Sequence, residues 1–192
     1  MIRANGLELM NGFSHESETA FGRLAGELTP SDVPKVLVAG LGLGYTLAAA
    51  SEALGARGTI TVAEFSPAVI DWFARYVRAS VLPAMPNNVA IRETDAIAHL
   101  RSGARYDLIL LDIDNGPEPL VRSSNATLYD REGLQLLRSA INEKGCVLLW
   151  SGFESESFEA TAREAGFSVT RRVVANGPRP DLDHHIYILR GA

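Results

Sequence analysis

Residues 35–44 read KVLVAGLGLG, an apolar run followed by a glycine at every second position. Val36–Ala39 contains no polar side chain, which predicts a strand covered on both faces of a sheet. The three glycines let the backbone turn sharply and approach a ligand closely, because glycine has no Cβ atom. Thr46–Leu54 then has a helical pattern, and the free N–H groups of a helix start favour a negatively charged group. The loop is either a ligand site or a tight turn whose glycines only permit packing.

Apolar runs and helical patterns alternate along the chain after this stretch. We expect four further strands, at Thr59–Ala63, Val89–Ile91, Tyr106–Leu111 and Cys146–Trp150. A helix is expected after Ser66-Pro67, which supplies an N-cap and a first-turn proline. Its apolar face would consist of Ile70, Phe73, Ala74, Val77 and Val81. This alternation is typical of a parallel sheet with helices on both faces.

The last two expected strands, Ser168–Ala175 and His185–Leu189, break the alternation. Only eight residues lie between Ala175 and His184. A parallel connection needs about a dozen or more, so the last strand is expected to run antiparallel to its neighbour. We therefore predict an α/β fold, a single Rossmann-like three-layer sandwich with a mostly parallel seven-stranded sheet whose last strand is antiparallel. Residues 1–34 would form a short N-terminal hairpin and a helix, and residues 35–192 the Rossmann-like domain.

The charge balance limits the partners of this chain. Eighteen Lys and Arg against 23 Asp and Glu give the 192 residues a net charge of −5. We therefore expect no nucleic-acid partner and no attraction to an anionic membrane. The longest uncharged stretch has 16 residues, fewer than the ~20 that span a bilayer. One cysteine excludes an internal disulfide and a multi-cysteine zinc site. We expect a cytoplasmic protein that acts on a small molecule.

Acidic residues follow three successive strands of the predicted sheet. Glu64 lies 24 residues after Gly40, at the end of the second strand of the alternation. An acid about 20 residues after such a loop can accept both hydroxyls of a ribose. Asp95 follows the third strand and Asp112 ends the fourth. Acids at one edge of the sheet favour a nucleoside site over an ordinary solvated surface.

The glycine spacing separates this chain from nicotinamide-binding proteins. Their G-x-G-x-x-G fingerprint places the third glycine five positions after the first, and here the interval is four. At this point the chain resembles the spermidine synthase-like (polyamine aminopropyltransferase-like) branch of the class I S-adenosylmethionine-dependent methyltransferase superfamily. The resemblance covers most of residues 35–190, and it is carried by residues 35–44, 62–65, 93–96 and above all 106–112.

The resemblance implies a cofactor, S-adenosyl-L-methionine or a decarboxylated or related derivative. Glu64, followed by Phe65, would hold the ribose, and Asp95 beside Ala96 would bind the adenine amino group. Asp112 would lie next to the reacting sulfonium and amine. The glycines that would wrap the amino-acid end of the cofactor are Gly40, Gly42 and Gly44. Members of the family commonly self-associate, so a homodimer is expected.

The chain departs from the family where an ammonium group would be bound. Aminopropyltransferases have an Asp at the position of Leu43 and a second loop Asp at the position of Asn115, and methyltransferases often have an acid at the position of Val38. The missing carboxylates disfavour a polyamine substrate. Asp112 or Asp114 would have to bind the ammonium group instead.

Residues 113–128 form a long connection at the predicted ligand edge. Its 16 residues exceed the ordinary length of a loop, which favours a substrate-binding loop over a simple turn. Asn115 and Glu118 would contact the substrate, and Trp150 would stack on it unless it belongs to the core. Asp112, Asp114 and His15 are the candidates to orient the nucleophile and accept its proton. No metal site is predicted, because the Asp-Asn pair of catechol-type methyltransferases is replaced by Trp150-Ser151.

Taken together, these patterns favour an S-adenosylmethionine-dependent transferase. Methyl transfer to a small molecule, with an amine as the acceptor that suits the acids, is the first expectation. Aminopropyl transfer from decarboxylated S-adenosylmethionine is the alternative within the same class. A non-catalytic nucleoside-binding protein is the alternative from another class, favoured by Val38 and Leu43.

Overall fold

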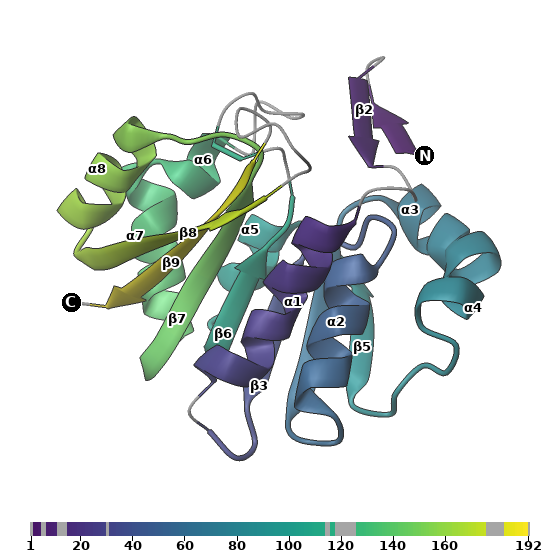
Figure 1. Cartoon of the computed structure of the whole chain (residues 1–192). Helices are drawn as coiled ribbons and strands as arrows, with labels where there is room; N and C mark the ends of the chain where they lie inside the picture. Colours follow the sequence, from purple (N-terminus) through teal and green to yellow (C-terminus); the bar gives the residue numbers. More distant parts are fainter. Residues whose placement is uncertain are drawn as a thin grey trace.

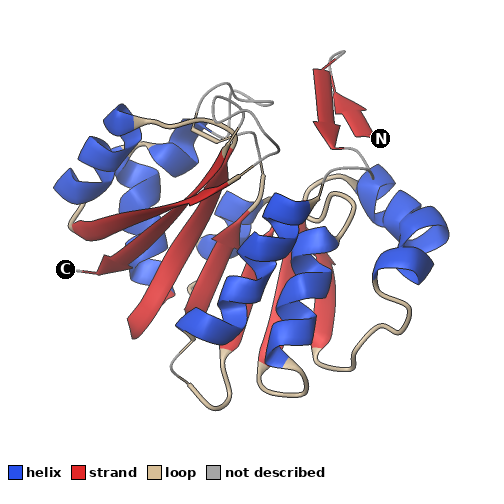
Figure 2. Cartoon of the chain, viewed as in Figure 1, coloured by secondary structure: helices blue, strands red, loops and turns tan. Residues whose placement is uncertain are grey.

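The structure is a computed structural model. It describes residues 2–4, 7–10, 15–29, 31–113, 116–117, 126–175 and 183–191. Within these ranges the chain forms a seven-stranded sheet flanked by helices, and a separate two-stranded hairpin (Figures 1 and 2). The strands of the large sheet are β3 (Lys35–Ala39), β4 (Thr59–Glu64), β5 (Val89–Glu93), β6 (Tyr106–Leu111), β7 (Ile141–Ser151), β8 (Phe167–Val174) and β9 (His184–Gly191).

The strand order confirms the predicted sheet. It runs β5-β4-β3-β6-β7-β9-β8. The pairs from β5 to β7 are parallel, and β9 pairs antiparallel with both β7 and β8. The expected antiparallel last strand is therefore present. The order reverses beside β3, so the glycine loop lies at the position where open α/β sheets bind ligands.

The helices form layers on the two faces of the sheet. They are α1 (Glu16–Leu28), α2 (Tyr45–Leu54), α3 (Pro67–Trp72), α4 (Arg78–Val81), α5 (Ala96–Leu100), α6 (Ala126–Tyr129), α7 (Arg131–Ala140) and α8 (Glu156–Glu164). Successive strand residues face opposite layers. Val36 and Val38 pack in the core under α1 and α2, whereas Leu37 and Ala39 pack in the core with α5, α7 and α8 (Figure 1).

The N-terminal part contains the two predicted features. β1 (Ile2–Ala4) pairs antiparallel with β2 (Leu7–Met10), as expected for a hairpin. The helix α1 packs along α2, and Gly22 allows the close approach, because a Cβ atom there would collide with the backbone of Thr46. Phe21 and Leu24 of α1 are buried in the same core as β3. The division of the chain at residue 34 stays a prediction.

Two local expectations were wrong. The strand β7 begins at Ile141, five residues before the expected start at Cys146, because residues 142–144 are polar and only partly buried or exposed and so lack the apolar signal. The helix after Ser66-Pro67 contains a π-helical turn, η1 (Phe73–Val77). This wider turn changes the helical phase. Phe73 is buried as expected, but Ala74 is exposed rather than on the apolar face.

Candidate functional site

The glycine loop between β3 and α2 requires glycine at its three positions. Gly40, Gly42 and Gly44 have φ angles of 96°, 51° and 81°, a region that residues with a Cβ atom rarely adopt. A Cβ atom on Gly40 would also collide with the carbonyl oxygen of Asp112, and one on Gly44 with the ring of Phe73. The loop therefore packs tightly against the end of β6 and the π-helical turn, which fixes its shape.

Glu64 at the end of β4 is oriented by the glycine loop. Its Oε2 accepts a hydrogen bond from the Leu41 N–H at 2.9 Å, and its Oε1 accepts one from the Ser66 N–H at 2.8 Å. A carboxylate oxygen has capacity for a second hydrogen bond. Glu64 is thus held at the loop with acceptor capacity remaining, as its predicted role toward a ribose requires.

The other predicted nucleoside contacts follow β4 and β5 at the same edge of the sheet. Phe65 is 55% exposed at the end of β4. Asp95 caps the helix α5, and its Oδ1 accepts a hydrogen bond from the Ala98 N–H at 3.1 Å. Ala96 is buried in the first turn of that helix. β4 and β5 pair in parallel register, so these residues lie beside Glu64.

Asp112 directly follows β6, next to the glycine loop. Its Oδ2 accepts a hydrogen bond of 2.6 Å from the Thr46 hydroxyl, which lies in the first turn of α2. Burial raises the pKa of the Asp112 carboxyl to about 7, the hydrogen bond from Thr46 opposes that rise, and the charge of Glu18 adds to it. A carboxyl that titrates near neutral pH suits proton transfer.

Trp150 and His184 lie on neighbouring strands on the α1 side of the sheet. Their ring centroids are 4.8 Å apart in a T-shaped arrangement. Trp150 is partly buried against the core under α1 and α2, and its Nε1 is a buried donor with no hydrogen-bond partner among the described residues. Burial lowers the pKa of His184, and the charge of Glu18 opposes this. Whether Trp150 touches a substrate stays a prediction.

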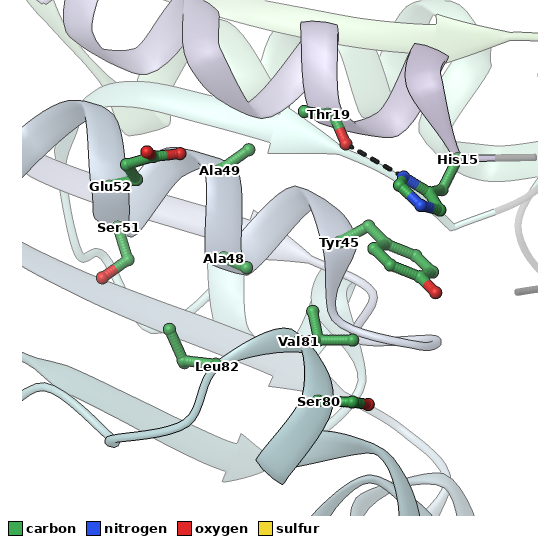
Figure 3. A pocket seen from close by; sticks show the side chains of 10 residues that line it. All are labelled: His15, Thr19, Tyr45, Ala48, Ala49, Ser51, Glu52, Ser80, Val81 and Leu82. Atoms are coloured by element: carbon green, nitrogen blue, oxygen red, sulfur yellow. Dashed lines mark hydrogen bonds between the residues drawn. The ribbon is translucent and has the colours of Figure 1, made fainter.

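His15 lies at the start of α1, beside Tyr45, the first residue of α2. Its ring stacks on Tyr45 with a centroid distance of 4.0 Å, and its Nδ1 is 3.4 Å from the Thr19 hydroxyl. Both rings line a groove of about 610 Å³ between α1, α2 and α4 (Figure 3). The contacts of His15 therefore place it at this groove, and its role as a general base stays a prediction.

Three predicted site residues, Asp114, Asn115 and Glu118, lie outside the residues that the structure describes. Within the described ranges, no group of three His, Cys, Asp or Glu side chains is placed to hold a metal ion. In the same ranges, no helix is long and apolar enough to cross a membrane.

Thr46 and Glu18 lie near Asp112 but were not predicted from the sequence as site residues. The only sequence signal for Thr46 is a hydroxyl two positions after the last loop glycine, in a stretch that otherwise reads as a buried helix. Glu18 belongs to a polar helix start that indicates capping rather than a site. Glu18 lies near Asp112 because of the way in which α1 packs on α2.

The comparisons with known proteins agree on the fold. No known family model matches the sequence, and no curated protein matches it either. Among solved structures, human Methyltransferase-like protein 13 in complex with SAH is similar over 93% of this chain and 82% of its own, with 16% identity and a TM-score of 0.67. TrmN from Thermus thermophilus is similar over 93% of this chain and 53% of its own, with 18% identity and a TM-score of 0.65.

Spermidine synthases are similar as well. Spermidine synthase in complex with the transition-state analogue AdoDATO matches over 98% of this chain, with 14% identity and a TM-score of 0.78. This chain spans 65% of the length of that protein. The fold is therefore that of class I S-adenosylmethionine-dependent methyltransferases, which the spermidine synthase-like branch shares.

Proposed function

We propose that the protein is an S-adenosylmethionine-dependent transferase that methylates a small, amine-bearing molecule. The observation that carries this proposal is the position of Asp112. Its backbone carbonyl lies against Gly40 of the glycine loop, and its carboxyl accepts a hydrogen bond from Thr46 in the first turn of α2 and has a pKa of about 7. A group of this kind, beside the loop expected to bind the sulfonium end of the cofactor, suits an amine acceptor.

The chain's own residues would bind the cofactor, orient the acceptor amine and take its proton. The glycine loop would bind the amino-acid end of the cofactor, and Glu64 the ribose. The cofactor supplies an activated methyl group, so the reaction needs mainly a nucleophile held in line with that group. Asp112 would orient the acceptor amine and take its proton, and Thr46 would keep the Asp112 carboxyl in one orientation.

Aminopropyl transfer is the second candidate. The similarity to spermidine synthase at a TM-score of 0.78 favours it. The buried apolar side chains of Val38 and Leu43 argue against it, because neither gives the loop a carboxylate for a cationic ligand. They equally favour a nucleoside-binding protein without catalysis, which the following experiment separates from an enzyme.

The test is transfer of a labelled methyl group from S-adenosylmethionine to a panel of small amines. We expect transfer by the wild type and loss of transfer in Asp112→Asn, with Glu132→Gln, an exposed acid of α7, as the matched control. Transfer by Asp112→Asn at the wild-type rate would contradict the role of Asp112. Binding of the cofactor without transfer to any amine would favour the non-catalytic alternative.

A further inference from the structure

The connection between β7 and α8 carries an exposed aromatic residue at the edge of the sheet where the candidate site lies. Phe153 follows the last residue of β7, Ser151, by two positions. It is 52% exposed, whereas Ser151 is fully buried. Because β7 runs parallel to β6, the connection leaves the sheet at the same edge as Asp112. Ligands of open α/β sheets bind beyond this edge.

The backbone of Phe153 is held by two buried hydroxyl groups. The Ser151 hydroxyl accepts a hydrogen bond from the Phe153 N–H at 3.1 Å and donates one to the Phe153 carbonyl oxygen at 2.7 Å. The hydroxyl of Tyr187, a fully buried residue of β9, donates to the same carbonyl oxygen at 3.5 Å. It also accepts a hydrogen bond from the Ser155 N–H at 2.7 Å. The loop is therefore fixed, although its aromatic residue stays outside the core.

The connection that follows β6 packs against the same buried hydroxyl. A Cβ atom on Gly116 would collide with the Ser151 hydroxyl, so the backbone of Gly116 lies against it. Gly116 and Pro117 are both buried. Gly116 comes four residues after Asp112, and Ser151 holds the backbone of Phe153. Ser151 thus joins the Phe153 loop to the connection that begins beside the carboxyl of the candidate site.

Trp150 places a second aromatic ring beside Asp112. Leu111 pairs with Leu149 in the register of β6 and β7, so Asp112 and Trp150 follow on neighbouring strands at the same level. Both side chains lie on the face of the sheet that α1 and α2 cover. Asp112 accepts a hydrogen bond from Thr46 of α2, and Trp150 packs against the core under these two helices. The carboxyl expected to orient the acceptor therefore has an aromatic neighbour.

Negative charge dominates around this end of the sheet among the described residues. Glu18 raises the pKa of both Asp112 and His184. Asp183 also raises the pKa of His184, and the charge of His185 lowers it. Surroundings of this sign favour a cationic group and disfavour an anionic one. An amine suits them, and a carboxylate or phosphate on the same acceptor does not.

Resting on the proposed function, we infer that the acceptor is an amine with an apolar body of aromatic size and no anionic group, and that Phe153 selects it by packing against that body. Trp150 contacts the part of the acceptor next to the amine. A ring whose backbone is already fixed provides apolar contact at a low cost in conformational entropy. The amine nitrogen forms a bond to the methyl carbon as the carbon–sulfur bond breaks, its electron pair stays on the sulfur, and the amine's proton goes to the Asp112 carboxylate.

The test is the steady-state kinetics of labelled methyl transfer to three amines. They are 2-phenylethylamine, ethylamine, which lacks the ring, and phenylalanine, which adds a carboxylate. For the wild type, we expect kcat/KM for 2-phenylethylamine to exceed that for either of the other two by at least about tenfold.

Phe153→Ala should raise the KM for 2-phenylethylamine about tenfold and leave kcat within about twofold of the wild type, because the ring contact acts on binding alone. Its kcat/KM for ethylamine should not change. Phe153→Tyr keeps the ring and should keep the wild-type KM. The matched control is Tyr76→Ala, which removes another exposed aromatic side chain, from η1, and should behave as the wild type with all three amines.

An unchanged KM of Phe153→Ala for 2-phenylethylamine would overturn the inference and leave the proposed function intact. An equal loss of Phe153→Ala with 2-phenylethylamine and ethylamine would also overturn it, since Phe153 would then support the loop rather than contact the ring. Wild-type transfer to phenylalanine at the rate of 2-phenylethylamine, or only to a diamine such as 1,4-diaminobutane, would refute the acceptor class. If the wild type bound S-adenosylmethionine but methylated no amine, the proposed function itself would fail.

Discussion

Replacing Asp112 by Asn should make the folded protein more stable at neutral and alkaline pH. The Asp112 carboxyl has a pKa of about 7 in the folded state against 3.8 as its ordinary value. Below the ordinary value, the carboxyl is protonated in both the folded and the unfolded state. Between the two values, the folded state keeps a proton that the unfolded state has lost, so stability falls as pH rises and the penalty is complete above pH 7.

The magnitude follows from the difference between the two pKa values. About three units at 1.36 kcal/mol each give a penalty of roughly 4 kcal/mol at pH 8, an upper limit because Asp112 is partly exposed at the sheet edge. At pH 5 the same reasoning gives under about 2 kcal/mol. The Asn side chain carries no charge and still accepts the Thr46 hydrogen bond. Its advantage in unfolding free energy over the wild type should therefore grow by roughly 2–3 kcal/mol between pH 5 and pH 8.

Urea unfolding at pH 5, 6, 7 and 8 measures this difference directly. Glu132→Gln removes an exposed carboxylate and should follow the wild type at every pH. If the advantage of Asp112→Asn over the wild type were the same at pH 5 and pH 8, the raised pKa of the Asp112 carboxyl would be refuted. The variant should also lose methyl transfer, so that the gain in stability accompanies a loss of activity.

Three further predictions address the glycine loop and its partners. Gly40→Ala should lower the free energy of unfolding by more than Gly103→Ala does, because both glycines have positive φ but only at Gly40 would the added Cβ atom collide with a backbone atom. An equal loss in the two variants, of about 1–3 kcal/mol from backbone strain alone, would contradict the tight packing of the loop. Thr46→Val should raise the pKa of Asp112 above about 7 and move the acid limb of the pH profile of the transfer rate to higher pH, whereas Thr46→Ser should keep the wild-type profile. A pH profile of Thr46→Val that overlays that of the wild type would refute the positioning role of Thr46. Glu64→Ala should weaken S-adenosylhomocysteine binding in calorimetry by about tenfold or more; retention of wild-type affinity would remove the ribose assignment.

The fold could be predicted from the sequence because its signals are local. The buried strands are short apolar runs, the loop requires glycine, and the connection before His184 is too short for a crossover helix. Local signals failed where tertiary packing decided the outcome. β7 begins early because Ile141 pairs with Tyr106 of β6, although residues 142–144, which follow it, are polar. The π-helical turn brings Phe73 under Gly44, a contact that no helical periodicity encodes.

The candidate site was predictable where its residues directly follow strands, and not where helix packing brings them together. Glu64, Asp95 and Asp112 each follow a strand, so parallel pairing brings them to one edge. Glu18 lies near Asp112, on the other side of Thr46, only because α1 packs on α2. Small residues such as Gly22 are the only signal of that packing in the sequence. His184 packs against Trp150, a contact that depends on the pairing of β9 with β7. Long-range packing of this kind leaves no pattern in a single sequence.

The most direct test of the account is calorimetric binding of S-adenosylmethionine and of decarboxylated S-adenosylmethionine, with NAD as the control. The two sulfonium ligands differ by one carboxylate, the negatively charged group that the N–H groups at the start of α2 favour. We expect S-adenosylmethionine to bind at least about tenfold more tightly than the decarboxylated ligand, equivalent to ~1.4 kcal/mol, and NAD not to bind. Tighter binding of the decarboxylated ligand would contradict methyl transfer in favour of aminopropyl transfer, and binding of neither would contradict the nucleoside site.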